Sequence, residues 1–143
     1  MRRTRSTSGF SLIELLLVLA ILGIISAIAI PQFLGQRRRA RVIGDAQSNA
    51  RVLAMMLESR KAEIGIYGAA STYEWKKDGT ATTGPALLPQ FTPQGNSLMN
   101  FTVVTANNGL TYTLTVTDPN MANAPVLTGD QTGTITLDPT YNK

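Results

Sequence analysis

The sequence predicts an α+β protein in which one long N-terminal helix packs against a small antiparallel sheet of three to four strands. Three patterns lead to this expectation. Residues 15–30 form an uncharged apolar run, apolar residues then recur at helical spacing as far as Ile64, and short alternating segments follow Asn100. The helical pattern comes first and the strand patterns come last, which is typical of the α+β class.

The composition excludes several classes of function. The 143 residues include no cysteine, so disulfides, thiolate nucleophiles and cysteine-based metal sites are ruled out. They also include no histidine, the commonest general base and transition-metal ligand. We therefore expect the protein not to be an enzyme. The formal net charge is +4, but three of the 13 basic residues lie in the first nine positions, and the other 10 nearly balance the 9 acidic residues.

The N-terminal segment combines a basic leader, residues 1–9, with an apolar run. Residues 10–30 would form about 31 Å of helix, which is enough to cross a bilayer core. The leader's arginines, Arg2, Arg3 and Arg5, predict a cytoplasmic N-terminus. A second basic group just beyond the run opposes this charge bias; it consists of Arg37, Arg38, Arg39 and Arg41.

A secretory signal peptide is an alternative interpretation of the same segment. Ala27, Ile28 and Ala29 form a small-x-small pattern, and cleavage there would release a soluble protein that starts at Ile30. Glu14 argues against it, because a carboxylate within an apolar span costs about 2.5–3.5 kcal/mol and therefore needs a purpose or a partner. Alternatively, Glu14 has no partner and its side chain reaches the polar edge of the bilayer, because it lies near the start of the apolar run.

The sequence GFSLIE at residues 9–14, between a basic leader and an apolar run, resembles the processing signal of type IV pilins and of type II secretion pseudopilins. The resemblance is strong over residues 1 to 40 and architectural beyond. It implies the pilin fold. It also implies that a prepilin peptidase cuts between Gly9 and Phe10 and methylates the new amine of Phe10. Ser11 stands where many members of the family carry threonine.

The same resemblance gives roles to three residues of the apolar helix, residues 10–31. It implies that Glu14 faces the N-terminal ammonium of a neighbouring subunit, which would lower the cost of a carboxylate in lipid and set the register of assembly. Gly23 and Pro31 are expected to soften the helix, since glycine has low helix propensity and proline removes a hydrogen bond. A simple proline kink is the alternative.

Residues 32–64 are predicted to continue as an amphipathic stalk helix that Gly65 and Gly68 end. Its apolar stripe should pack against the sheet; the stripe consists of Ile43, Ala46, Ala50, Leu53, Leu57 and Ile64. The arginines at positions 37, 38, 39 and 41 could contact lipid phosphates or acidic groups of adjacent subunits, or could form a solvated face. Nucleic acid is an improbable partner, because no aromatic residues interleave with them.

The head is expected to comprise residues 65–143. Residues 65–100 are predicted to be an irregular connection, fastened to the core by Leu87, Leu88 and Phe91. Its polar tip, residues 73–79, contains Trp75, which could be a contact surface or a loop anchor.

Residues 101–143 carry the strand signals. Two alternating segments flank Asn107, Asn108 and Gly109, which predicts a hairpin. The buried face of its second strand should contain Leu110, Tyr112, Leu114 and Val116. Residues 126–127 and 133–138 are the remaining strand candidates.

A calcium site in the head is a weaker hypothesis. Many pilins close this region with a disulfide, and this chain has no cysteine to form one. Pseudopilins are the relatives known to bind Ca²⁺ here, and oxygen donors of the right kind occur in the turns. The candidate ligands are Asp118, Asn120, Asp130 and Asp138. No other cofactor is expected.

The leader, Glu14, the stalk and the head, together with the resemblance to pilins, predict that the protein is a structural subunit of a type IV pilus-like filament. The alternatives are a pseudopilin of a type II secretion system and a minor or competence pilin that takes up DNA, for which Lys76 and Lys77 are the slender basis. The expected partners are copies of the same chain, the prepilin peptidase and an inner-membrane assembly machinery. The protein would cross the inner membrane once before assembly and then enter a surface filament, or a periplasmic one if it is a pseudopilin.

Overall fold

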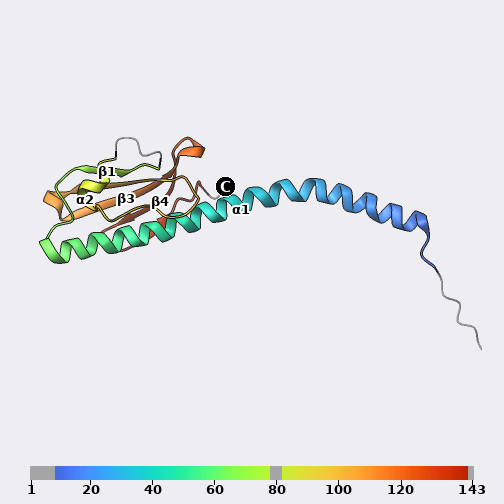
Figure 1. Ribbon diagram of the computed structural model, residues 1–143, viewed down its shortest axis with the longest axis horizontal. Helices are drawn as coiled ribbons and strands as arrows, with labels where there is room; N and C mark the ends of the chain where they lie inside the picture. Colours follow the sequence, from blue (N-terminus) through green and yellow to red (C-terminus); the bar gives the residue numbers. More distant parts are fainter. Residues whose placement is uncertain (1–8, 78–81, 142–143) are drawn as a thin grey trace, which may run out of the picture. The chain divides into compact units, whose positions relative to one another are not determined.

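A computed structural model describes residues 9–77 and 82–141 of the chain (Figure 1). The leader arginines at positions 2, 3 and 5, and the tip residues Asp78 and Gly79, lie outside the described residues. The chain divides into two compact units, residues 1–38 and residues 39–143. The long helix α1 (Leu12–Ile64) contributes its first part to the first unit and its remainder to the second.

In the first unit, α1 carries the uncharged apolar run of residues 15–30, which has no polar face. The helix contains Pro31 in its interior and is unbroken at both Gly23 and Pro31. A Cβ atom added at Gly23 would meet no other atom within 4 Å, so packing within the chain does not require glycine there. The expected softening of the helix at these two positions stays a prediction.

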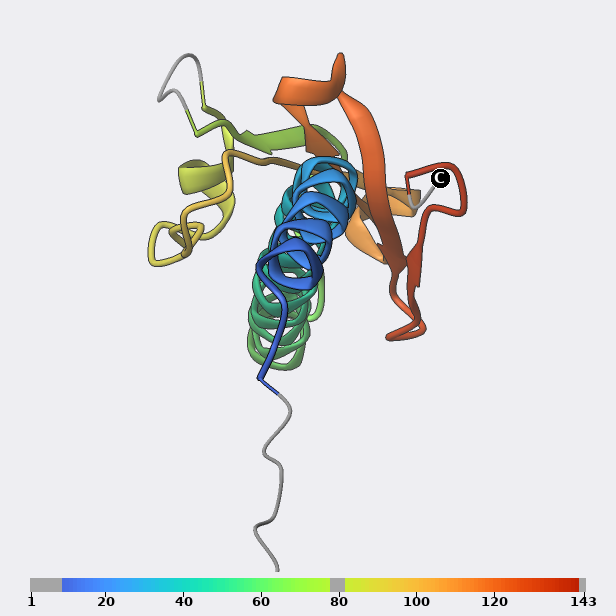
Figure 2. The same ribbon diagram turned by 90° about the vertical axis from the view of Figure 1, so that its right-hand side faces the viewer.

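The second unit contains an antiparallel sheet of five strands in the order β1-β2-β3-β4-β5, which packs on its share of α1 (Figure 2). The strands are β1 (Thr72–Trp75), β2 (Asn100–Ala106), β3 (Thr111–Asp118), β4 (Ala124–Asp130) and β5 (Ile135–Leu137). Each strand pairs with its neighbour in the sequence. The α+β architecture is therefore as predicted, with one strand more than expected.

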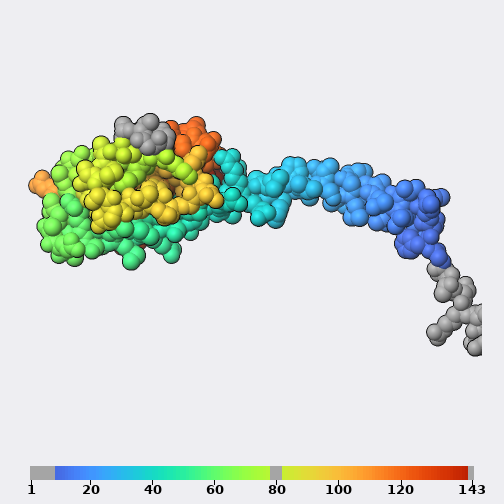
Figure 3. Space-filling model, viewed as in Figure 1, coloured from blue at the N-terminus to red at the C-terminus, as the bar shows by residue number. Residues whose placement is uncertain are grey.

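The additional strand, β1, lies within the segment that was predicted to be irregular. Its sequence, TYEW, has the β-branched and aromatic residues that favour strands, but the surrounding glycine, proline and alanine obscured a signal only four residues long. The same segment contains one helical turn, α2 (Gly84–Leu87). Residues 82–99, between β1 and β2, form much of the head surface that faces the viewer in Figure 3.

The stalk stripe packs against the sheet mainly as predicted, because Ala46, Ala50, Leu53 and Leu57 are buried. Ile43 is half-buried. The prediction is wrong for Ile64, which is 53% exposed, since the chain turns away immediately after it at Gly65, whose φ is +84°. Val42 and Asn49 are also buried and were not predicted.

Two polar side chains of α1 fasten the connection that precedes β2. Asn49 donates from Nδ2 to the carbonyl of Gln94 at 2.7 Å and accepts from the amide of Gln94 at 2.8 Å. Asp45 accepts from the amide of Ser97 at 3.2 Å and from its hydroxyl at 2.5 Å. Both side chains thus bind backbone groups that no strand partner satisfies.

Trp75 is a core anchor and not a contact surface. Its side chain is only 3% exposed and meets the ring of Phe91 edge to face, with 5.3 Å between centroids. Leu87, Leu88 and Phe91 are buried as predicted.

The predicted hairpin connects β2 and β3. Asn107, Asn108 and Gly109 have φ values of +50°, +56° and +82°, the left-handed conformations that asparagine and glycine tolerate. Tyr112, Leu114 and Val116 are buried as predicted. Leu110 is 53% exposed, which corrects its predicted burial. It belongs to the turn, and β3 begins one residue later.

Asp118 ties the C-terminal segment to the end of β3. Its side chain is almost completely buried; one carboxylate oxygen accepts from the amide of Asn120 at 2.9 Å, and the other accepts from the hydroxyl of Tyr141 at 2.8 Å. Tyr141 is buried as well. This hydrogen bond joins residues 23 positions apart in a chain that has no disulfide.

Replacing Tyr141 with phenylalanine should lower the free energy of unfolding by about 1–3 kcal/mol, because a buried carboxylate oxygen loses its donor. Denaturant unfolding of the full chain in detergent, followed by tryptophan fluorescence, measures the loss. Tyr73→Phe is the control, since the Tyr73 hydroxyl makes an exposed hydrogen bond to Ala69 at 3.2 Å. Equal effects of the two substitutions would contradict a special role for the buried bond.

Because of Tyr67, we expect the folded head to lose stability in alkaline solution. Burial, together with the hydrogen bond to Glu58 at 2.7 Å, raises the pKa of Tyr67 to about 12. The folded state holds the proton of the Tyr67 hydroxyl more tightly than the unfolded state does. The protonated hydroxyl therefore stabilises the folded state fully below pH 10, and this contribution is lost as the pH rises towards 12. We expect a loss of about 2 kcal/mol between pH 9 and pH 11.5, measured by denaturant unfolding at these two pH values. Tyr67→Phe should be less sensitive to pH over this range.

Candidate functional site: the N-terminal segment

The bond between Gly9 and Phe10 lies in an exposed, non-helical segment before α1. Neither residue is helical, and the Phe10 side chain is 79% exposed. A Cβ atom at Gly9 would meet nothing within 4 Å. Glycine at this position therefore has no packing role in the described chain, whereas an enzyme that binds the segment in an extended form would benefit from the missing side chain.

Glu14 caps the start of α1. Its Oε2 atom accepts a hydrogen bond from the amide of Ser11 at 2.9 Å, and the helix begins at Leu12. Serine followed three positions later by glutamate is the pattern of a capping box. Our sequence interpretation missed this role, although the pattern is visible in the sequence. The negative charge also lies at the positive end of the helix dipole, so the carboxylate has a favourable position within its own chain.

The apolar part of α1 has no cover within the described chain. Its most hydrophobic 18-residue window has a mean hydropathy of 2.8, and no part of that window is buried. It is the one helix of the described residues that is long and apolar enough to cross a membrane. All large apolar side chains between Leu12 and Leu34 are exposed. A surface of this kind requires either lipid or other apolar helices around it.

The arginines after the apolar part have no carboxylate within ion-pair distance in the described chain, whose one ion pair joins Lys76 to Glu74 at 3.2 Å. Arg37 lies over the ring of Phe33, 5.9 Å from its centroid. Arg37 and Arg38 are exposed in the first unit, and in the second unit Arg41 is exposed and Arg39 is half-buried. Their predicted contacts with lipid or with other subunits stay predictions.

The candidate calcium ligands occupy separate turns. Asp118 holds Asn120 and Tyr141, whereas Asp130 and Asp138 each accept from the amide and the hydroxyl of the threonine two positions later. These hydrogen bonds lower the pKa of both Asp130 and Asp138, the hydroxyl contributing more than the amide. Residues 9–77 and 82–141 contain no cluster of three or more acidic side chains that could hold a metal ion.

The described chain has a pilin-like architecture: a long helix whose first part is apolar and whose second part packs on an antiparallel sheet. Comparison with known families agrees, because residues 4–30 match the family described as the prokaryotic N-terminal methylation motif. The resemblance inferred from residues 9–14 is thereby confirmed. The N-terminal segment of this chain is such a motif.

Two curated proteins are similar to a larger part of the chain. Fimbrial protein Q of Moraxella bovis is 38% identical over 80 residues, which cover 53% of this chain and 49% of that protein. The type IV major fimbrial protein FimA of Dichelobacter nodosus is 35% identical over 85 residues, which cover 51% of this chain and 53% of that protein. The chain thus spans about half the length of these relatives. No solved structure matches it.

Proposed function

We propose that this protein is a structural subunit of a type IV pilus-like filament. The observation that carries the proposal is the combination of an N-terminal methylation motif with an apolar helical segment of which no residue is buried. The similarity to two type IV fimbrial proteins supports it.

Processing would convert the precursor into the assembling form. Hydrolysis of the peptide bond between Gly9 and Phe10 consumes one water molecule, releases residues 1–9 and leaves an amine on Phe10. Transfer of one methyl group from a methyl donor to this amine completes the N-terminus. The two residues are exposed and lie outside the helix, so the bond would be accessible to a membrane-embedded prepilin peptidase.

Assembly would then bury the apolar helices against one another. An ammonium group on Phe10 and the Glu14 carboxylate are the two charges of the processed apolar segment, and each is costly to bury alone. Pairing the ammonium of one subunit with Glu14 of its neighbour reduces both costs and fixes the axial register. The hydrogen bond of Glu14 to the Ser11 amide would hold the carboxylate in position before the neighbour arrives.

The location changes with assembly. Before it, the apolar helix would cross the inner membrane with the N-terminus in the cytoplasm, where the processing enzyme and the assembly machinery act. Afterwards the heads would face solvent on a surface filament. The two fimbrial relatives favour a surface pilus over the periplasmic filament of a secretion system. A DNA-binding pilin is less well supported, because Lys76 is paired with Glu74.

Intact mass measurement of the sheared extracellular fraction and of the membrane fraction tests this function. A mass that corresponds to residues 10–143 plus one methyl group, recovered from sheared fibres, is the expected result. The same mass confined to the membrane would favour a pseudopilin or a minor subunit. A soluble form that starts at Ile30 would contradict the proposal and identify an ordinary signal peptide.

Substitutions of Glu14 separate its two roles. Glutamine keeps an oxygen that can accept from the Ser11 amide but removes the charge, whereas alanine removes both. If pairing with a neighbour's ammonium drives assembly, both variants should be processed normally and should yield fewer fibres by roughly tenfold or more, given the cost of an unpaired buried charge. Fibre yield and intact mass are the measurements. Wild-type fibre yield from Glu14→Gln would show that the capping role suffices.

A further inference from the structure

The outer edge of the sheet at β1 is covered by a side chain. β1 is the first strand in the sheet order, so among residues 9–77 and 82–141 it has β2 on one side and no strand on the other. In an antiparallel edge strand, every second residue directs its N–H and C=O groups away from the sheet. In β1 these residues are Thr72 and Glu74, whose outward groups would accept a further strand if they were free.

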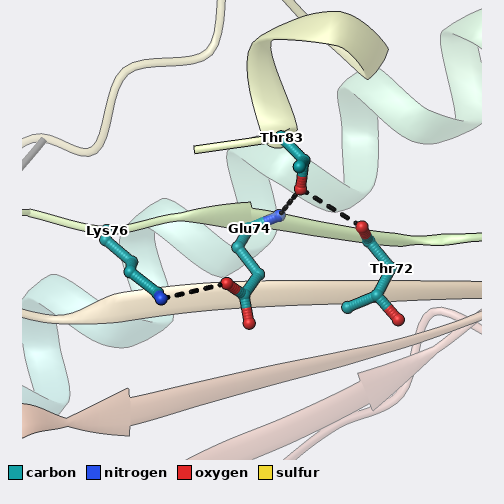
Figure 4. A network of polar contacts seen from close by, with 4 residues as sticks. All are labelled: Thr72, Glu74, Lys76 and Thr83. Atoms are coloured by element: carbon teal, nitrogen blue, oxygen red, sulfur yellow. Dashed lines mark hydrogen bonds and ion pairs between the residues drawn. The ribbon is translucent and has the colours of Figure 1, made fainter. Parts of the chain in front are cut away.

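The hydroxyl of Thr83 satisfies two of these outward groups, the N–H of Glu74 and the C=O of Thr72. The amide of Glu74 donates to Oγ1 at 3.0 Å, and Oγ1 donates to the carbonyl of Thr72 at 3.2 Å (Figure 4). A neighbouring strand would offer the same pair, one acceptor and one donor, at the same place. The single hydroxyl therefore takes the position of a strand partner at this point of the edge.

Gly84 and α2 hold Thr83 in this position. A Cβ atom at Gly84 would lie 2.2 Å from ring atoms of Trp75, so only glycine lets the backbone lie directly on the indole of β1. The helical turn that follows buries Leu87 in the core. Thr83 is thus fixed to β1 by its own hydroxyl and by a neighbour that packs on the same strand.

The sequence of β1 does not otherwise protect its edge. β1 contains no proline and one charged residue, Glu74, and Lys76 follows directly after the strand. If this edge segment paired with its copy in antiparallel orientation with Trp75 opposite Trp75, Glu74 of each copy would lie opposite Lys76 of the other, in place of the ion pair that the two residues form within one chain. A second copy of this chain is therefore the strand partner that the edge fits best.

We propose that the Thr83 hydroxyl closes the β1 edge against strand addition by a second copy of this chain. It matters wherever heads come close to one another, whether or not the copies form a filament. Thr83 acts by occupying two outward backbone groups of β1 with its hydroxyl. A substitution that removes the hydroxyl and keeps the shape of the side chain should therefore free these groups for a second strand.

Thr83→Val provides this substitution, with Thr83→Ser as the control that retains the hydroxyl. Both are made in the full chain in detergent micelles. In the valine variant, amide hydrogen exchange at Glu74 should accelerate by roughly tenfold, as expected for the loss of one hydrogen bond. Light scattering should show more dimer than for the wild type, and the serine variant should match the wild type in both measurements. Unchanged exchange at Glu74, or unchanged association, would overturn the proposal.

A second substitution in the valine background tests whether the new association uses the β1 edge. Glu74→Pro removes the outward N–H, and proline is tolerated at an edge strand where the N–H faces away from the sheet. The double variant should return to the wild-type association state, and a persistent dimer would overturn the proposal. Amide exchange in the central strand β3 monitors the fold. Loss of protection there in Thr83→Val would also overturn it, since Thr83 would then be needed for folding itself.

Discussion

The rest of the structure depends on one constraint: no part of the described chain covers the apolar first part of α1. The backbone polar groups of a helix are satisfied internally, so this segment can exchange one apolar environment for another without breaking its hydrogen bonds. Lipid tails and neighbouring apolar helices both meet its requirement. The one carboxylate of the segment, Glu14, stands at the start of the helix, where capping satisfies it locally. A membrane-bound state and a packed state are therefore open to the same helix without refolding.

In the head, a small sheet packs on a single helix, and no covalent crosslink holds the two together. Small residues at Ala46 and Ala50 are fully buried at the centre of the contact, and the larger Leu53 and Leu57 fill the core beside them. Buried polar groups then fasten the irregular segments. Asn49 holds the connection before β2, and Asp118 holds the C-terminal segment. Each of these bonds joins parts of the chain that are far apart in sequence, which is the role that a disulfide has in many small extracellular domains.

Much of this could be predicted because the strongest signals are local and periodic. The apolar run, the helical stripe and the Asn-Asn-Gly turn each follow from backbone geometry and side-chain burial over a few neighbouring residues. The errors arose where tertiary contacts decide. Ile64 follows the stripe but lies on the last turn, beyond the sheet, and Leu110 follows the strand alternation but belongs to the turn. β1 is too short to stand out, and Trp75 is buried because Gly84 and Phe91 pack on it.

The bond between Tyr141 and Asp118 also bears on where the head can fold. A disulfide needs an oxidant and an exchange catalyst, and a reducing environment opens it. A hydrogen bond between a phenol and a carboxylate needs neither and re-forms spontaneously after it is broken. The sequence contains no thiol, so the head has no disulfide that a reductant could open. The stability that the bond between Tyr141 and Asp118 provides is therefore the same whether thiols outside the protein are oxidised or reduced.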